Sequence, residues 1–234
     1  EEKKCSLRLL RPHEHGNGVY KTMEQLERFF GIQFGCNAYL TPANSQGFAP
    51  HYDDVEVFVC QTEGEKRWRL YKHQTQNDVL SPVSSGNFEQ EEIGEPILDA
   101  VVQTGDLLYI PKGVTHQAVC TDQDSLHVTL STGLGNSWED FLKLAMTRAI
   151  EIVASENPIL RRSLPRQFYR YMGVVHADQE DADVPELNSQ RDSFMEHTMN
   201  LLSEVIDAVP FDPAADQMAR AFTWGRQPPA LTKA

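Results

Sequence analysis

The fold of this chain is decided by the stretch Pro50-His51-Tyr52-Asp53-Asp54-Val55-Glu56-Val57-Phe58-Val59-Cys60. Valine occupies every second position from Val55 to Val59, which is the period-two pattern of a β-strand with one buried face. His51 and Asp53 continue the same spacing, so we expect them on a strand and on the face that carries the valines. The stretch therefore predicts a β-structure whose interior receives an imidazole and a carboxylate.

A second histidine, His116, follows the predicted strand 107–110 and a Pro- and Gly-containing turn. Two histidines and one carboxylate on one side of an ion form the facial triad of non-haem iron(II) oxygenases. A buried His51 and Asp53 without partners would be costly, and a metal ion resolves both. An H-x-D pair alone arises by chance, and zinc competes with iron, but the carboxylate and the lack of nearby cysteine favour iron. The sequence predicts iron(II) held by His51, Asp53 and His116.

Lys66 is a candidate for binding an anion inside the barrel. It begins the run Lys66-Arg67-Trp68-Arg69-Leu70 and shares one face with Trp68 and Leu70. A buried ammonium needs a counter-charge, which the distal carboxylate of 2-oxoglutarate would supply. The alternative is a surface lysine in the charged turn that starts at Glu63.

Two other predicted strands carry polar side chains where a core would be expected. One set is Asn37, Tyr39 and Thr41, and the other is His127, Thr129 and Ser131. These faces are either exposed to solvent or line a cavity that offers hydrogen bonds to a polar substrate.

The chain changes character near residue 135. Before it we expect the strands 37–41, 55–60, 66–71, 107–110 and 126–132, a helix over 21–30 with Gly31 as its C-cap, and a long loop over 74–96. The helix pattern places Met23, Leu26, Phe29 and Phe30 on one face. After residue 135 we expect helices over 137–153, 164–172, 192–209 and 213–222, with an acidic loop over 178–186. The pattern predicts a mostly β double-sheet jelly roll followed by a small all-α domain.

Composition limits the class of partner. The 234 residues are 40% hydrophobic and 24% charged, and the net charge of −13 argues against a nucleic-acid footprint and favours basic protein partners. No apolar run is long enough to cross a membrane. The four cysteines form no C-x-x-C pair, which argues against a disulfide framework or a zinc site and favours a reducing compartment. The chain lacks an initiator Met, so we expect an excerpt from a longer protein.

With these residues in view, the chain resembles the JmjC ribosomal oxygenases, most closely the nucleolar branch of bifunctional lysine-specific demethylases and histidyl-hydroxylases. The similarity runs from about Cys5 to about Thr232. It is carried by Asn37-Ala38-Tyr39-Leu40-Thr41-Pro42, Asn44-Ser45-Gln46-Gly47-Phe48-Ala49-Pro50-His51-Tyr52-Asp53-Asp54, Glu63-Gly64-Glu65-Lys66-Arg67-Trp68-Arg69, Gly105-Asp106-Leu107-Leu108-Tyr109-Ile110-Pro111 and Leu126-His127-Val128-Thr129-Leu130-Ser131-Thr132.

The resemblance implies a double-stranded β-helix over 1–135, without its first strands, and a helical dimerisation domain over 136–234, with a winged helix following beyond this chain. It implies catalysis at iron(II) on His51, Asp53 and His116, with O2 and with 2-oxoglutarate bound by Lys66 and Thr129. It implies a pocket for a target histidine, a homodimer, and location in the nucleus and nucleolus. The pocket residues are Arg8, Asn37, Tyr39 and Ser131.

Three functions follow as hypotheses. The first is hydroxylation of a histidine in a large-subunit ribosomal protein, and the second is demethylation of a histone lysine at the same iron site. Arg8 would repel a methylated ammonium, and the sequence shows no evident aromatic cage for one, so the first is favoured. The third, a non-catalytic scaffold or corepressor, is opposed by the intact triad and by Lys66.

Overall fold

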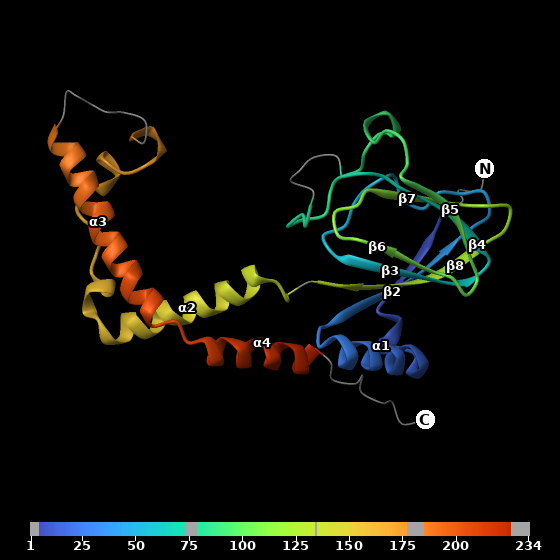
Figure 1. Cartoon of the computed structure of the whole chain (residues 1–234), viewed down its shortest axis with the longest axis horizontal. Coiled ribbons are helices and arrows are strands. Elements are labelled where there is room, and N and C mark those ends of the chain that lie inside the picture. Colours follow the sequence, from blue (N-terminus) through green and yellow to red (C-terminus); the bar gives the residue numbers. More distant parts are fainter. Residues whose placement is uncertain (1–4, 74–78, 134, 177–184, 226–234) are drawn as a thin grey trace. The chain divides into compact units, whose positions relative to one another are not determined.

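The structure is a computed structural model that describes residues 5–73, 79–133, 135–176 and 185–225. Its strands are β1 (Leu7–Leu10), β2 (Phe34–Thr41), β3 (Glu56–Glu63), β4 (Glu65–Leu70), β5 (Leu98–Gln103), β6 (Leu107–Ile110), β7 (His116–Cys120) and β8 (Ser125–Thr132) (Figure 1). Its α-helices are α1 (Asn17–Phe30), α2 (Trp138–Glu156), α3 (Pro185–Asp207) and α4 (Phe211–Gly225). Short 3-10 helices lie at Pro12–Glu14, Gln90–Glu92, Pro158–Arg161, Phe168–Arg170 and Val174–His176.

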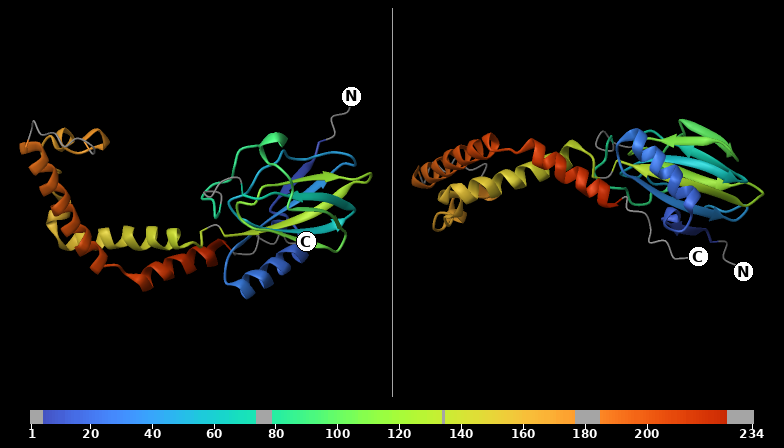
Figure 2. Two further views of the ribbon diagram at one scale, coloured as in Figure 1. Left: turned by 45° about the horizontal axis from the view of Figure 1, so that its top comes forward. Right: turned by 90° about the horizontal axis from the view of Figure 1, so that it is seen from below.

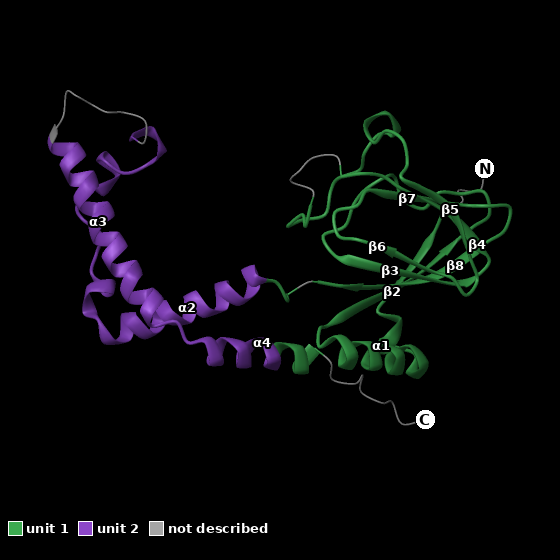
Figure 3. Ribbon diagram, in the orientation of Figure 1, with its two compact units in different colours: residues 1–137, 221–234 green, residues 138–220 purple. Residues whose placement is uncertain are grey.

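The chain forms two compact units, coloured separately in Figure 3. The described residues up to Ser137, together with 221–225, form the first unit, and residues 138–220 form the second. The sequence places the domain boundary at residue 135 and assigns the whole of α4 to the helical part. That division stays a prediction, and the two units are described separately below.

The first unit is built from two antiparallel sheets that face each other (Figure 1). The five-stranded sheet has the order β1-β2-β8-β3-β6, and the three-stranded sheet has the order β5-β4-β7. The described strands do not close into one barrel, because no ladder joins the edges of the two sheets. The chain passes from β3 to β4 through Gly64, whose φ is 64°. A Cβ there would collide with the carbonyl oxygen of Asp124, so only glycine fits this crossing between sheets.

The core lies between the two sheets, as the alternating valines predict. Its buried members are Val57, Val59, Trp68, Leu70, Val102, Ile110 and Val114. In the ladder between β3 and β8, Val57 pairs with Ser131 and Val59 pairs with Thr129. Directly paired residues share a face of the sheet, so these two polar residues of β8 lie on the same face as the core valines.

The outer face of the five-stranded sheet is covered in part by α1 (Figure 2). Met23 of the helix is buried against Phe34, Cys36 and Leu130, and Gly31 ends the helix with a φ of 70° as predicted. The prediction for Phe29 is wrong, because this side chain is 82% exposed. Phe29 lies six residues after Met23, about a third of a turn away from the buried face.

The second unit is held by contact between α2 and α3, where Ala149, Val153 and Val205 form a buried cluster. The helix predicted over 164–172 is wrong, since only Phe168–Arg170 is helical and as a single 3-10 turn. Gln167 has a φ of 62°, a left-handed conformation that interrupts a right-handed helix. The acidic loop predicted over 178–186 lies largely outside the described residues. No helix in the described part of the chain is both long and apolar enough to span a bilayer.

Candidate metal centre

The backbones of His51 and His116 are tied together, which brings two segments 65 positions apart in sequence into register. His116 donates its N–H to the carbonyl of His51 at 2.8 Å, and His51 donates to the carbonyl of His116 at 3.2 Å. This isolated bridge continues the three-stranded sheet beyond β7. The two imidazole rings lie with their centroids 4.6 Å apart. The two predicted histidine ligands therefore meet.

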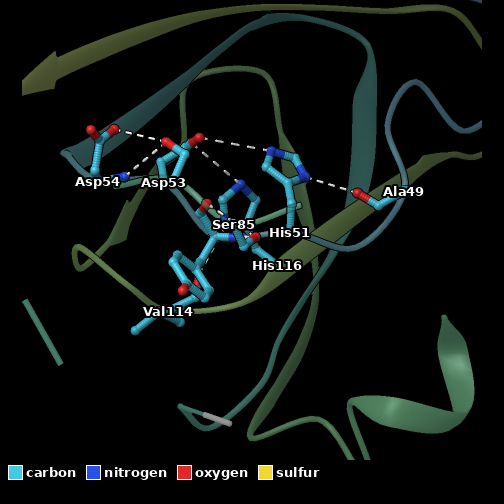
Figure 4. Close-up of polar contacts among 9 residues, drawn as sticks. Ala49, His51, Asp53, Asp54, Ser85, Val114 and His116 are labelled. Atoms are coloured by element: carbon cyan, nitrogen blue, oxygen red, sulfur yellow. Dashed lines mark hydrogen bonds and ion pairs between the residues drawn. The ribbon is translucent and has the colours of Figure 1, made fainter. Parts of the chain in front are cut away.

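Both rings are oriented by the same kind of hydrogen bond (Figure 4). Nδ1 of His51 lies 2.8 Å from the carbonyl oxygen of Ala49, and Nδ1 of His116 lies 3.0 Å from that of Val114. A carbonyl can only accept, so each Nδ1 carries the proton and each Nε2 keeps a free lone pair. Burial and the neighbouring ring of His51 lower the pKa of His116, which keeps it neutral as a metal ligand must be.

Asp53 faces both free nitrogens. Its Oδ1 lies 3.9 Å from Nε2 of His51, and its Oδ2 lies 3.8 Å from Nε2 of His116. These separations are too long for hydrogen bonds but suit donors that share an ion, since ligands about 2.1 Å from a metal lie about 3 Å apart. The three ligand atoms lie within 4.8 Å of one another, the only such group of three found among the described residues. The residues fit an octahedral metal with one carboxylate and two imidazoles.

The prediction that His51 and Asp53 sit on a regular strand is wrong. His51 makes only the isolated bridge, and the residues that follow it have no regular structure before β3. Their backbone hydrogen bonds run to other loops: Gly113 donates to the carbonyl of Asp53 at 2.9 Å, and the Ser85 hydroxyl accepts from the N–H of Tyr52 at 2.8 Å. The backbone that carries the carboxylate is thus held between two loops and not by a ladder.

The three residues border a cavity of about 130 Å³ between the sheets. It is lined by Arg8, Tyr39, Phe48, His51, Asp53, Val57, Lys66, Trp68, His116, Gln117, Ala118, His127 and Thr129. The polar faces of β2 and β8 thus border a cavity, while Leu130 on the opposite face of β8 packs under α1. Of the predicted pocket residues, Asn37 and Ser131 are absent from the lining.

Lys66 enters this cavity from β4 and is 4% exposed. Its ammonium donates to the Thr41 hydroxyl at 3.0 Å and lies 5.8 Å from the ring centre of Trp68. Within the described chain it forms no ion pair. Burial lowers the pKa of Lys66, because no carboxylate offsets the loss of hydration. The structure therefore holds a buried cation with no counter-charge among the residues that it describes.

Of the four residues predicted to hold a substrate, Arg8 and Asn37 lie near Tyr39, while Ser131 lies further along the sheet. Arg8 pairs with Tyr39 in the β1–β2 ladder. Burial raises the pKa of the Tyr39 phenol, although Arg8 and Asn37 both act to lower it. Ser131 lies opposite Gly35 across the β2–β8 ladder, where a Cβ on residue 35 would come within 2.8 Å of the Ser131 hydroxyl. Glycine thus leaves room for this serine.

Three polar or aromatic residues that line the cavity have no role predicted from the sequence: Phe48, Trp68 and Gln117. His127 was predicted only to lie on a polar strand face. Trp68 and His127 had a signal, since each shares a strand face with a predicted site residue. Phe48 lies in a loop without periodicity, and Gln117 follows a candidate metal ligand, so no sequence pattern predicts that either residue lines the cavity. The expectation that no aromatic cage is evident needs correction, because Tyr39, Phe48 and Trp68 all line the cavity.

Comparison with known proteins adds strong relatives. Ribosomal oxygenase 1 of Danio rerio is 43% identical over 99% of this chain and 41% of its own length. Ribosomal oxygenase 1 of Homo sapiens is 45% identical over 97% of this chain and 35% of its own length. The bifunctional lysine-specific demethylase and histidyl-hydroxylase NO66 of Dictyostelium discoideum is 44% identical over 98% of this chain and 44% of its own length. The chain thus spans less than half of each relative.

The X-ray structure of E. coli ycfD superimposes with a TM-score of 0.52 over 86% of this chain and 50% of that one, at 14% identity, which supports the fold alone. The model of the JmjC domain matches residues 9–139, from within β1 to the first turn of α2. That match covers the two sheets, the metal centre and Lys66. The chain belongs to the JmjC domain family.

Proposed function

We propose that this chain is the core of an iron(II)- and 2-oxoglutarate-dependent protein oxygenase that hydroxylates a histidine of a large-subunit ribosomal protein. One observation carries the proposal: a triad of two imidazoles and a carboxylate shares a cavity with a buried lysine that has no counter-charge among the described residues. The triad suits a metal with open positions, and the lysine suits a dicarboxylate that reaches that metal.

His51, Asp53 and His116 would hold the metal through two Nε2 atoms and a carboxylate oxygen. Iron(II) there would supply the redox chemistry that couples the oxidative decarboxylation of 2-oxoglutarate by O2 to hydroxylation of a substrate C–H bond. The chain's own residues orient the ligands. The carbonyls of Ala49 and Val114 fix which nitrogen of each ring is free.

Lys66 and Thr129 would bind the co-substrate. The Lys66 ammonium can pair with its distal carboxylate and regain the electrostatic stabilisation that burial removed. Thr129 borders the same cavity from β8 and offers a hydroxyl. The inter-sheet core around Val57 excludes water from this end of the site.

Arg8, Asn37, Tyr39 and Ser131 would bind the target histidine. Arg8 and Tyr39 line the cavity, where both offer hydrogen bonds to a neutral ring and Arg8 adds a positive charge. Asn37 and Ser131 lie outside that lining, and the family resemblance supports including them. The relatives named ribosomal oxygenase support a ribosomal-protein substrate, and the net charge of −13 suits a basic one. Such a substrate is met where ribosomes are assembled, so we keep the nucleus and nucleolus as the proposed location.

Histone lysine demethylation is the second candidate, supported by the Dictyostelium relative's name and by the aromatic lining of the cavity. Tyr39 and Phe48 meet edge to face with centroids 5.9 Å apart, an arrangement that can border a methylated ammonium. Arg8 lines the same cavity, and its positive charge disfavours a cationic substrate. The positive charge of Arg8 therefore favours histidine hydroxylation over lysine demethylation.

We also propose a two-fold symmetric homodimer formed by the helical unit. Four apolar residues of α3, at helical spacing, are exposed: Met195 at 40%, Met199 at 65%, Leu202 at 40% and Ile206 at 60%. An exposed apolar stripe of this kind is stabilised when a second copy covers it.

The test of the proposed function measures succinate and peptide products together. The chain is incubated with Fe²⁺, 2-oxoglutarate and O2, and with either histidine-containing ribosomal peptides or trimethyl-lysine histone peptides. Addition of one oxygen atom to the histidine supports the hydroxylase, and release of formaldehyde from the histone peptide supports the demethylase. Absence of succinate with every peptide would reject both.

A further inference from the structure

His127 is a buried imidazole in the cavity for which the proposed function gives no role. It lies on β8, is 3% exposed, and borders the same cavity as Lys66 and the metal centre. Burial and the charge of Lys66 lower the pKa of His127 to about 3, so the ring is neutral at every physiological pH. A buried polar ring beside an unpaired cation calls for an explanation.

The plane of His127 is fixed by its neighbours. It stacks on Tyr39 with centroids 5.0 Å apart and planes 13° apart, and the Trp68 ring meets it edge to face at 5.6 Å. These contacts belong to a closed circuit of rings around the cavity, each within about 6 Å of the next. The circuit runs Phe48, Tyr39, His127, Trp68, His116, His51 and back to Phe48. The ring of His127 cannot turn to search for another partner without breaking this circuit.

The two ring nitrogens differ in their surroundings. Nδ1 is sealed from solvent and has no hydrogen-bond partner in the part of the chain that the structure describes. Nδ1 lacks a partner in either tautomer, so the tautomer is decided at Nε2, where a proton can be donated to an anion in the cavity. Nε2 is not sealed in this way, and His127 lines the cavity, so Nε2–H is a donor that faces the cavity.

Nε2–H and the Lys66 ammonium together suit a carboxylate. Lys66 has one neutral partner in Thr41. Lys66 and His127 line the same cavity, and both contact the ring of Trp68, at 5.8 Å and 5.6 Å between centres. A carboxylate has two oxygens that each accept hydrogen bonds, so one cation and one neutral donor can bind it without placing two positive charges together.

We propose that His127 donates a hydrogen bond from Nε2 to the distal carboxylate of the co-substrate and so shares with Lys66 the recognition of that anion. The inference rests on the proposed function, because it names a further residue for the co-substrate of that reaction. It makes His127 a determinant of co-substrate choice: a 2-oxo acid without the second carboxylate gains nothing from it.

The experiment compares two ligands in matched variants of the full chain. 2-Oxoglutarate and 2-oxobutanoate have the same keto-acid end, but only the first has a distal carboxylate. Each is titrated by calorimetry, without turnover, into chain loaded with Mn²⁺ in place of iron. His127→Phe keeps the flat ring and removes both nitrogens, His127→Gln keeps a donor near the position of Nε2, and His127→Asn keeps one near Nδ1 instead.

His127→Phe is expected to weaken 2-oxoglutarate binding by about 10–100-fold, the worth of one hydrogen bond to a charged group, and to leave 2-oxobutanoate unchanged. His127→Gln should stay within a few-fold of the unsubstituted chain, and His127→Asn should resemble His127→Phe. Unchanged 2-oxoglutarate binding in His127→Phe would overturn the proposal. Equal weakening of both ligands would overturn it too, because His127 would then only shape the cavity. If the unsubstituted chain binds Mn²⁺ but not 2-oxoglutarate, the proposed function itself fails.

Discussion

The ammonium of Lys66 lies 3.0 Å from the hydroxyl of Thr41, and the two side chains are 4% and 1% exposed. The contact joins β4 of one sheet to β2 of the other. A neutral hydroxyl does not offset a buried charge, so the fold maintains an unfavourable cation at this point. That is expected of a binding group whose partner arrives as a ligand.

Replacing this lysine should therefore separate binding from stability. Lys66→Met is expected to weaken 2-oxoglutarate binding by about 2–5 kcal/mol, as when one member of a buried charge pair is lost. The same change should raise the free energy of unfolding of the ligand-free chain, because an unpaired buried charge is removed. Calorimetry and urea denaturation measure the two effects, with Lys21→Met on the exposed side of α1 as control. Unchanged 2-oxoglutarate binding would place the anion elsewhere.

The metal centre should fail when any one of its ligands is removed. His51→Ala, Asp53→Ala and His116→Ala are expected to lose bound iron and succinate formation while the chain keeps its secondary structure. The exposed Asp122→Ala serves as the carboxylate control. Bound iron is measured by elemental analysis and folding by circular dichroism. Full iron content in two of the three ligand variants would reject the assignment.

Much of this site could be predicted from the sequence, for reasons visible in particular residues. The valine alternation from Val55 to Val59 reports one buried face, and the core confirms it. β7 was missed because it is packed on both faces, and buried residues there do not alternate. A strand was expected near the start of the chain, but the bounds of β1 could not be predicted because all four of its residues are exposed, which leaves no periodic signal.

The geometry of the metal centre could not be predicted in the same way. The backbone carbonyl of Asp53 accepts a hydrogen bond from Gly113, in a loop more than 55 residues later in the chain, and no local sequence pattern predicts such a contact. The donor role of His127 depends on which of its nitrogens is sealed, a property of the folded cavity. The residue types can be read from the sequence, but their positions and hydrogen-bonding roles depend on how the folded chain packs.

The crossing from β3 to β4 should be sensitive to any side chain at Gly64. Gly64→Ala is expected to destabilise the chain by about 2–4 kcal/mol, from left-handed strain together with the collision with the Asp124 carbonyl. Gly94 has a similar φ of 69° but open space around it, so Gly94→Ala should cost only about 1 kcal/mol. Urea denaturation compares them, and equal costs would mean that the backbone relieves the collision.

The exposed stripe on α3 should govern association. Met199→Glu and Ile206→Glu are expected to convert a dimer into monomers, because each places a charge within the proposed apolar interface. Asn200→Glu, on another face of the same helix, is the control. Sedimentation velocity distinguishes the two states. A dimer that persists in both stripe variants would move the interface to another surface.

The four predicted substrate residues should affect product formation more than co-substrate turnover. Asn37→Ala is expected to slow histidine hydroxylation by about tenfold or more through the loss of a hydrogen bond to the substrate ring, and to spare the slow 2-oxoglutarate decay that occurs without substrate. Ser131→Ala should act in the same direction. Succinate and hydroxylated peptide are measured side by side. Equal loss of both products would mean that these residues support the metal site instead.

The most direct measurement is the mass of a histidine-containing ribosomal peptide after incubation with the chain, Fe²⁺, 2-oxoglutarate and O2. The account predicts one added oxygen atom on the histidine, one succinate for each hydroxylated peptide, and neither product with Asp53→Ala. An unmodified histidine, together with formaldehyde released from a trimethyl-lysine histone peptide, would contradict it.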